Sequence, residues 1–191
     1  MRWVSDPTSY EPLTRFACGG ASNHEQAVEE ALDELRDMGP EDTVEFKVRV
    51  AEARHADDLV GVSIFLKRPL GDSGEYADAV CLALTVVNEP YRGWRMPDGT
   101  SRIGTFLLCD ALAQIEDQWG HPMPDVWGAV HEENKDCQNM LSRHGFWRLR
   151  DSKRDPANFY FVYLRPKDLD WAAKFSPLIL NAVKQASAPL A

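Results

Sequence analysis

The sequence predicts an α+β fold in which helices flank a mainly antiparallel sheet. Three stretches rich in Val, Leu and Ile, 44–50, 59–66 and 79–87, follow one another along the chain. The first alternates apolar with charged residues, as half-buried strands do, and the third is continuously apolar, as fully buried strands are. Their succession predicts an antiparallel meander. The apolar spacing of residues 106–119 then predicts an amphipathic helix.

The stretch before the meander contains one strong helix signal. Ser22 and Glu25 form a capping-box pattern, apolar residues recur at helical spacing as far as Met38, and Gly39-Pro40 ends the pattern. Residues 2–4 fit a short edge strand. The outer face of the expected helix is acidic and carries Glu29, Glu30, Asp33, Glu34 and Asp37.

The second half of the chain predicts three more strands. Residues 126–130 form a short apolar run, and residues 146–150 and 159–164 indicate a closing hairpin. The tail has apolar residues at roughly helical spacing, which favours a terminal helix packed on the domain or on a second subunit. We therefore expect a domain over 1–166, a helical extension over 167–191, and a homodimer as one possible assembly.

Composition narrows the classes of function. The formal net charge is −9, from 21 basic and 30 acidic residues. Non-specific nucleic-acid binding depends on phosphate neutralisation by Lys and Arg, so this balance argues against a nucleic-acid partner. It mildly favours a cationic substrate, and surface solubility is the simpler explanation. The amino terminus lacks the apolar core of a signal peptide, and the run at 79–87 is too short to span a bilayer.

The cysteines predict neither disulfides nor a metal site. Cys18, Cys81, Cys109 and Cys137 are scattered, with no Cys-x-x-Cys pair and no histidine cluster beside them. Structural thiols in a reducing cytoplasm are the interpretation that fits this pattern.

The segment between the run at 79–87 and the helix at 106–119 has the composition of an anion site. A buried strand, a basic loop that contains glycine, and a helix start follow one another. The first amides of a helix have no internal partner, and the helix dipole favours an anion there. Gly104 allows a ligand to approach the backbone closely.

Two motifs in this region resemble those of the GNAT superfamily of acyl-CoA-dependent N-acyltransferases. Tyr91-Arg92-Gly93 and residues 103–108 resemble the two halves of its pyrophosphate-binding motif. Glu133-Asn134-Lys135 and Gly145-Phe146 resemble its later strand–helix–strand motif, at the usual spacing. The resemblance covers residues 76–164. It implies a GNAT-type sheet that is splayed between the fourth and fifth strands, with acetyl-CoA as acyl donor and an amine as acceptor.

The resemblance also implies which residues contact acyl-CoA. Backbone groups of the fourth strand would bind the pantetheine arm and the acyl carbonyl, and amides at the helix start would hold the pyrophosphate. Asn134 would bind the pantetheine or cap its helix, and the two roles are compatible. The expected contacts are Thr85, Val86, Val87, Arg92, Arg102, Ile103, Gly104, Thr105 and Asn134, with Arg95 as a further candidate.

Two departures from the family pattern concern the site. Residues 94–101 are inserted where the family usually has one residue, and Arg102 replaces the first glycine of the motif. Leu141 stands where many members have a tyrosine that protonates the leaving thiolate. Replacement proton donors could be His144, Tyr160 or Tyr163, with packed or surface side chains as the alternative. Asp78 is the candidate base, provided that a bulge turns it toward the site, and Glu75 is the other nearby acid.

These observations predict an N-acyltransferase that moves an acetyl or other acyl group to a primary amine of a small cationic molecule or peptide. The amine would attack directly within a ternary complex. Two alternatives remain open. Phe16-Ala-Cys18-Gly19 is similar to a sequence before the first helix of toxins that acetylate aminoacyl-tRNA. The second alternative is a non-catalytic acyl-CoA-binding regulatory module, because the usual tyrosine is missing.

Overall fold

The computed structural model describes most of the chain between Met1 and Tyr163. The described residues are 1–4, 11–14, 16–20, 22–37, 47–52, 59–70, 76–96, 99, 101–120, 123–151 and 158–163. The expected strand residues 44–46 and the expected extension at 167–191 lie outside this set. The domain boundary at residue 166 therefore stays a prediction.

The described strands form one seven-stranded sheet in the order β1-β2-β3-β4-β5-β7-β6. Every neighbouring pair is antiparallel except β4 and β5, which are parallel. The mixed, mainly antiparallel sheet is thus confirmed. The strands are β1 (Arg2–Val4), β2 (Lys47–Glu52), β3 (Leu59–Lys67), β4 (Val80–Val87), β5 (Val126–His131), β6 (Phe146–Asp151) and β7 (Asn158–Tyr163).

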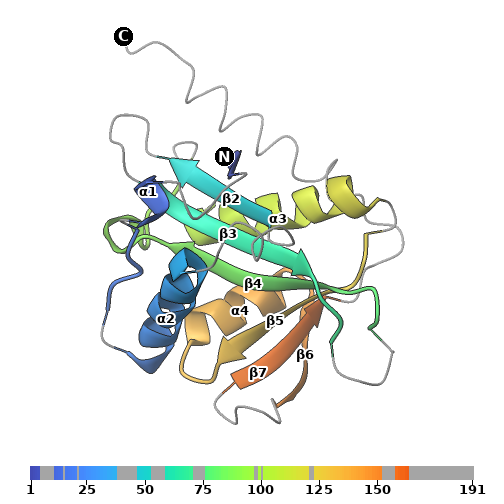
Figure 1. Ribbon diagram of the computed structural model, residues 1–191. Helices are drawn as coiled ribbons and strands as arrows, with labels where there is room; N and C mark the ends of the chain where they lie inside the picture. The colour runs from blue at the N-terminus through green and yellow to red at the C-terminus, as the bar shows by residue number, and fades with distance from the viewer. Residues whose placement is uncertain are drawn as a thin grey trace.

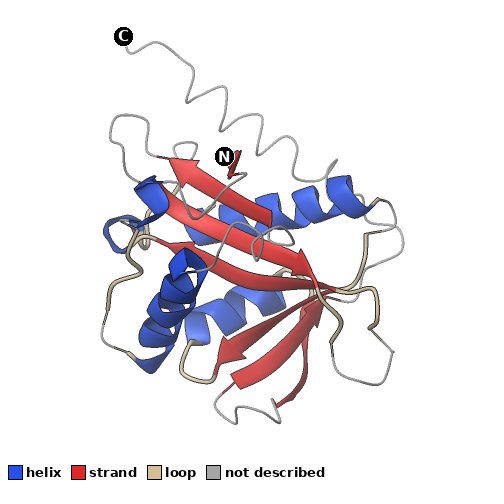
Figure 2. Cartoon of the chain, in the orientation of Figure 1, coloured by secondary structure: helices blue, strands red, loops and turns tan. Residues whose placement is uncertain are grey.

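Helices cover both faces of this sheet (Figures 1 and 2). They are α1 (Glu11–Thr14), α2 (Asn23–Asp37), α3 (Ile103–Trp119) and α4 (Lys135–Arg143), with a 3-10 turn η1 (Glu89–Tyr91). On one face α1 and α2 pack on β2 and β3, where Leu32 and Val62 are fully buried. On the other face α3 and α4 pack on β4 and β5, around Leu112 and Val126. Among the described residues, no helix is both long and apolar enough to cross a membrane.

The start of α2 follows the capping-box pattern in part. The carboxylate of Glu25 accepts a hydrogen bond from the Ser22 amide, at 3.1 Å, as such a box requires. The Ser22 hydroxyl does not accept from the Glu25 amide but donates to the same carboxylate, at 2.6 Å. The helix therefore begins at the predicted place, and the serine hydroxyl has a free lone pair on its other side.

Arg49 departs from the expected alternation of buried and solvent-facing residues. The pattern of 44–50 predicts a solvent-facing side chain, but Arg49 is only 7% exposed. Its guanidinium donates two hydrogen bonds to Asp110 of α3, from Nε to Oδ2 at 2.7 Å and from Nη2 to Oδ1 at 2.8 Å. The expectation was wrong at this position because α3 places Asp110 opposite Arg49, whereas Lys47 and Glu52 of the same strand are half-buried and exposed, respectively.

Candidate functional site

The parallel strands β4 and β5 separate soon after they meet. Beyond two paired positions β4 runs on to Val87 and β5 to His131 without further pairing between them. The splay expected between the fourth and fifth strands is therefore confirmed. It leaves backbone groups along residues 82–87 without partners from β5, where an extended ligand can bind them. The paired positions are Val80 with Val126 and Cys81 with Trp127.

A β-bulge in β4 coincides with this splay. Ile64 of β3 pairs with Leu84, whereas the next residue, Phe65, pairs with Leu82, so Ala83 is the extra residue. The bulge changes which face the side chains take. Leu82 packs in the α3 layer and Leu84 in the α2 layer. Because bulges bend a strand, we infer that this one turns the second half of β4 away from β5.

The opening holds a pocket of about 200 Å³ that helices of both layers line. This volume is smaller than the roughly 300–1,000 Å³ of sites for whole drug-sized ligands. It suits a thioester end and a small acceptor better than an entire acyl-CoA. The lining residues are His24, Ala27, Val28, Ala31, Leu82, Ala83, Leu84, Thr85, Leu108, Gly128, Ala129, Val130, His131, Asn134, Cys137, Met140, Leu141 and Phe146.

The N-terminus of α3 is open to an anion. The first helical hydrogen bond runs from the Phe106 amide to the Arg102 carbonyl, at 3.0 Å, and the Ile103 amide donates to a loop carbonyl at 3.2 Å. The amides of Gly104 and Thr105 have no acceptor among the described residues. No side chain caps this end, and its first turn has no acidic residue. Two free amides and the dipole of a 17-residue helix therefore face the loop.

Gly104 leaves room at this helix start. A methyl group on its Cα would lie 3.7 Å from Val87 Cγ2 and 3.8 Å from Met140 Sδ, which are ordinary contact distances. The fold would therefore accept alanine at this position. An aspartate carboxylate at this position would instead repel a bound anion. Comparing alanine with aspartate at residue 104 therefore tests the site.

Arg92, expected at the phosphate, is engaged with the segment before α2. Its guanidinium bonds the carboxylate of Glu25 and the backbone carbonyl of Cys18, and it lies 2.7 Å from Cys18 Sγ and 3.2 Å from the Gly19 carbonyl oxygen. Hydrogen bonds from Ser22, and then the one from Arg92, lower the pKa of Glu25 from 4.5 to about 2. A phosphate role for Arg92 stays a prediction, since its guanidinium already has partners.

Arg102 lies directly at the start of α3 and is exposed. It forms an isolated β-bridge with Arg95, so residue 95, near the beginning of the insertion, lies beside the start of the helix. The Arg95 guanidinium donates to the Gly99 carbonyl at 3.3 Å. Arg102 is therefore the charged candidate whose position next to the free amides best suits a phosphate.

Thr85 contributes an unpartnered hydroxyl to the wall of the opening. It pairs across the sheet with Ser63, and both side-chain oxygens are buried without a hydrogen-bond partner among the described residues. A buried polar group without a partner is costly, so a ligand group that bonds Thr85 would be stabilised. Val86 is buried, and Val87 lies beside Gly104.

Asn134 and His144 lie at the two ends of α4. The Asn134 side chain accepts a hydrogen bond from the Cys137 amide at 3.0 Å, so it caps the helix, and it also lines the pocket. Nδ1 of His144 is 2.7 Å from the Met140 carbonyl oxygen at the C-terminal end. His144 is not among the pocket-lining residues, whereas Leu141 is. A proton-donor role for His144 is thus still a prediction.

The structure gives less information on the remaining catalytic candidates, Asp78, Tyr160 and Tyr163. Asp78 lies before β4, at the end away from the opening, where its carboxylate is 91% exposed and 3.1 Å from Lys67 Nζ. Tyr160 and Tyr163 are in β7, where their backbones pair with Ala129 and Val126. The tyrosine side chains lie outside the described ones. The predicted roles, base for Asp78 and proton donor for Tyr160 or Tyr163, therefore stay predictions.

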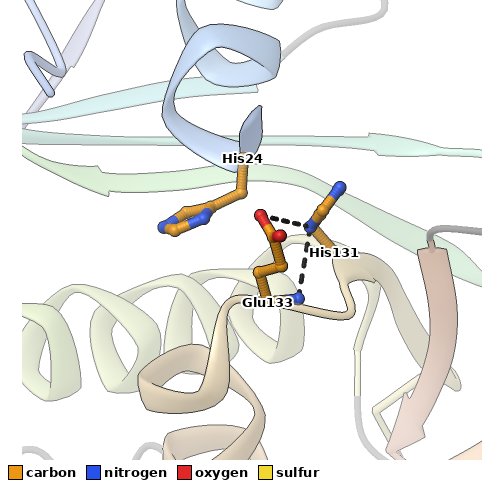
Figure 3. Close-up of side chains that lie close together, drawn as sticks. All are labelled: His24, His131 and Glu133. Atoms are coloured by element: carbon orange, nitrogen blue, oxygen red, sulfur yellow. Dashed lines mark hydrogen bonds and ion pairs between the residues drawn. The ribbon is translucent and has the colours of Figure 1, made fainter. Parts of the chain in front are cut away.

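One cluster at the pocket had no counterpart in the sequence prediction. His24 at the start of α2, His131 at the end of β5 and Glu133 in the following turn each place one potential ligand atom within 4.8 Å of the others (Figure 3). Both histidines line the pocket. No spacing rule connects His24 with a residue so distant along the chain, so only the fold reveals the cluster.

Burial raises the pKa of the two thiols near the site, Cys18 and Cys137. Burial raises the pKa of the Cys137 thiol to about 11. Burial also raises the pKa of Cys18, and the positive charge of Arg92 opposes the shift. None of the four cysteines forms a disulfide. The pKa values of Cys18, Cys81 and Cys137 are all raised, in the direction opposite to that of a nucleophilic thiol.

Comparisons with known proteins identify the fold. No protein-family model and no curated protein matches the chain. Among solved structures, a bacterial toxin has a TM-score of 0.61 at 15% identity and covers 99% of this chain and 97% of its own. The PaiA N-acetyltransferase of Thermoplasma acidophilum, in complex with coenzyme A, has a TM-score of 0.56 at 15% identity and covers 86% of this chain and 98% of its own. A proposed GNAT-family acetyltransferase of Desulfovibrio desulfuricans has a TM-score of 0.54 at 12% identity and covers 85% of this chain and 94% of its own.

These identities are low, so the likeness concerns the fold. The chain has the GNAT fold that the two motifs predicted, with the sheet splayed between β4 and β5.

Proposed function

We propose that the protein is an N-acyltransferase that moves an acetyl or other acyl group from acyl-CoA to a primary amine of a small cationic molecule or peptide. The single observation that carries this proposal is the opening between β4 and β5. It has a helix start with free amides on one side and a pocket bordered by α2 on the other. Acyl transfer needs these two parts, a grip on the donor and room for an acceptor.

The donor would lie along the α3 side. Its pyrophosphate would accept hydrogen bonds from the amides of Gly104 and Thr105, with Arg102 supplying positive charge. Its pantetheine arm would follow the unpaired edge of β4, where Thr85 has a free hydroxyl. The acyl carbonyl would then reach the pocket.

The acceptor would enter from the α2 side, where two acidic residues support a cationic substrate. Ala27 and Ala31 line the pocket, and Glu30 and Glu34 each lie three residues further along, next to this stripe on the helix surface. Both glutamates are exposed. Glu29, by contrast, accepts a hydrogen bond from the Gly19 amide at 2.9 Å, so its carboxylate already has a partner within the protein.

In the reaction, the amine nitrogen attacks the acyl carbonyl carbon. A carbon–nitrogen bond forms, the carbon–sulfur bond breaks, the nitrogen loses a proton and the thiolate of CoA gains one. Leu141 cannot donate that proton, and no carboxylate lines the described pocket, whereas the imidazoles of His24 and His131 do line it. We propose that rate enhancement comes mainly from holding both substrates in position, with solvent or one of these imidazoles exchanging the protons.

Binding of acetyl-CoA tests the donor site. Acetyl-CoA should raise the melting temperature of the wild type by mass action. Gly104→Asp places a negative charge at the free amides and should abolish most of this rise, whereas Gly104→Ala, which the packing accepts, is the matched control. Equal acetyl-CoA binding by a folded Gly104→Asp variant would refute the assignment.

Turnover with a panel of amines tests the activity itself. Formation of free CoA should depend on both acetyl-CoA and a cationic amine. Acetyl-CoA binding without turnover on any amine would instead favour the non-catalytic regulatory module.

A toxin-type activity on aminoacyl-tRNA is the second candidate. The observation in its favour concerns the Phe16–Gly19 sequence. Arg92, in the loop before α3, donates hydrogen bonds to Cys18 and Gly19 of this sequence. The net charge of −9 argues against tRNA as a partner. Acetylation of aminoacyl-tRNA, measured beside the amine panel, separates the two candidates.

A further inference from the structure

We propose that His24, His131 and Glu133 form a binding site for one divalent transition-metal ion, with Zn²⁺ as the ion of choice, on the α2 side of the pocket. Two imidazoles and a carboxylate are a ligand set that zinc uses in proteins, where a fourth position stays open. The three side chains come from α2, β5 and the turn before α4, and one potential ligand atom of each lies within 4.8 Å of the others (Figure 3).

The distances fit a metal site before it closes on its ion. Tetrahedral zinc with bonds of about 2.0–2.2 Å holds its ligand atoms roughly 3.3–3.5 Å apart. His131 Nδ1 and Glu133 Oε2 are already 3.9 Å apart, and one ligand atom from each residue lies within 4.8 Å of the others. The Glu133 side chain is exposed, so it has room to turn toward an ion.

His24 has a buried ring nitrogen that the protein itself does not satisfy. Nδ1 has no hydrogen-bond partner within the part of the chain that the structure describes. Nε2 lies 3.4 Å from the Ser22 hydroxyl oxygen, whose own hydrogen goes to Glu25. In the tautomer in which Nε2 donates to the Ser22 oxygen, the lone pair is on Nδ1. Metal-bound histidines are oriented in this way, with one nitrogen donating to a neighbour and the other free for the ion.

His131 is also in a state that suits a metal. Its Nδ1 accepts the Glu133 amide at 3.2 Å, so this nitrogen carries a lone pair and no proton. The amide is exposed, and water can replace the imidazole as its acceptor if Nδ1 turns to an ion. The acidic chain, at −9, further favours cation binding.

An ion here would have two consequences. It would fasten the start of α2 to the end of β5, two segments that are distant in the sequence, and thereby stabilise the fold. It would also occupy the side of the pocket assigned to the acceptor, so Zn²⁺ should inhibit acyl transfer in competition with the amine. The inhibition rests on the proposed function, whereas the binding does not.

The test begins with full-length protein that has been treated with EDTA and desalted. Calorimetric titration with ZnCl₂ should show one saturable site, and Co²⁺ should give the visible absorption bands of a tetrahedral complex. Zn²⁺ at about a hundred times its dissociation constant should raise the melting temperature by about 5–10 °C. His24→Gln and His131→Gln should each weaken Zn²⁺ binding at least about 100-fold.

Matched controls locate the ion. His144→Gln and Glu132→Gln each change a residue of the same type outside the cluster and should leave Zn²⁺ affinity unchanged. Ser22→Ala keeps all three ligands and should weaken binding about tenfold, which tests the orientation of His24 even if the His24 variant folds poorly. Absence of a saturable site in the wild type, or binding that survives the His24→Gln/His131→Gln double change, would overturn the proposal. If turnover exists and Zn²⁺ binds without inhibiting it, the placement across the acceptor side is wrong.

Discussion

Replacing Asp110 with asparagine should strongly destabilise the protein. The carboxylate is fully buried and accepts two hydrogen bonds from Arg49, and asparagine keeps its shape but removes the charge. Removing one partner of a buried ion pair costs about 3–5 kcal/mol. A domain of this size loses about 2–4 °C per kcal/mol, so the melting temperature should fall by about 6–20 °C.

Urea unfolding followed by circular dichroism measures this loss directly. Asp117→Asn, an exposed position in the same helix, is the matched control and should change stability by less than about 0.5 kcal/mol. The Arg49→Met/Asp110→Leu double variant should recover most of the loss, because no unpaired charge remains buried. If Asp110→Asn cost no more than the Asp117 control, the pair would not hold β2 to α3.

Three further predictions concern the site. Glu30→Gln/Glu34→Gln should raise the Michaelis constant for a cationic amine at low salt and leave turnover at saturation unchanged. The difference should fade as salt rises, since exposed charges are screened over roughly 8 Å at physiological ionic strength. Glu25 has a pKa of about 2 in the folded state, so the stability it contributes is present above about pH 4.5 and is lost as pH falls through about 2. Unfolding at several pH values should therefore show Glu25→Gln less stable than wild type at pH 7, with a difference that shrinks as pH falls and vanishes below the folded-state pKa. His144→Ala should lower turnover by about a hundredfold if it is the proton donor and by much less if it only bonds the end of α4, and Tyr160→Phe and Tyr163→Phe are compared in the same assay.

Local patterns in the sequence predicted most of the elements. Period-two alternation and continuous apolar runs identified β2, β3 and β4, and the 3.6-residue spacing identified α2 and α3. The two motifs added the splay, which no periodicity encodes. Such patterns succeed because each depends on neighbours within a few residues of one another.

What the sequence did not predict depends on contacts between distant segments. Arg49 is buried because Asp110 lies opposite it, 61 residues later. The bulge at Ala83 is invisible in a run where every residue is small or apolar. His24 and His131 meet only because the fold brings the start of α2 and the end of β5 together at the pocket. In each case the chemistry depends on the partner, and the partner is fixed only once the sheet has assembled.

The bulge and the splay together suggest how the two substrates are kept apart. Because β4 changes face at Ala83, the pocket has α3 and α4 on one side and α2 on the other. A donor held at Gly104 and an acceptor guided by Glu34 would then approach the acyl carbon from opposite faces of the sheet. It follows that substitutions at the α3 start should change the Michaelis constant for acetyl-CoA alone, and those on α2 the constant for the amine alone. A change in α2 that altered both constants equally would mean that the two substrates share one entrance.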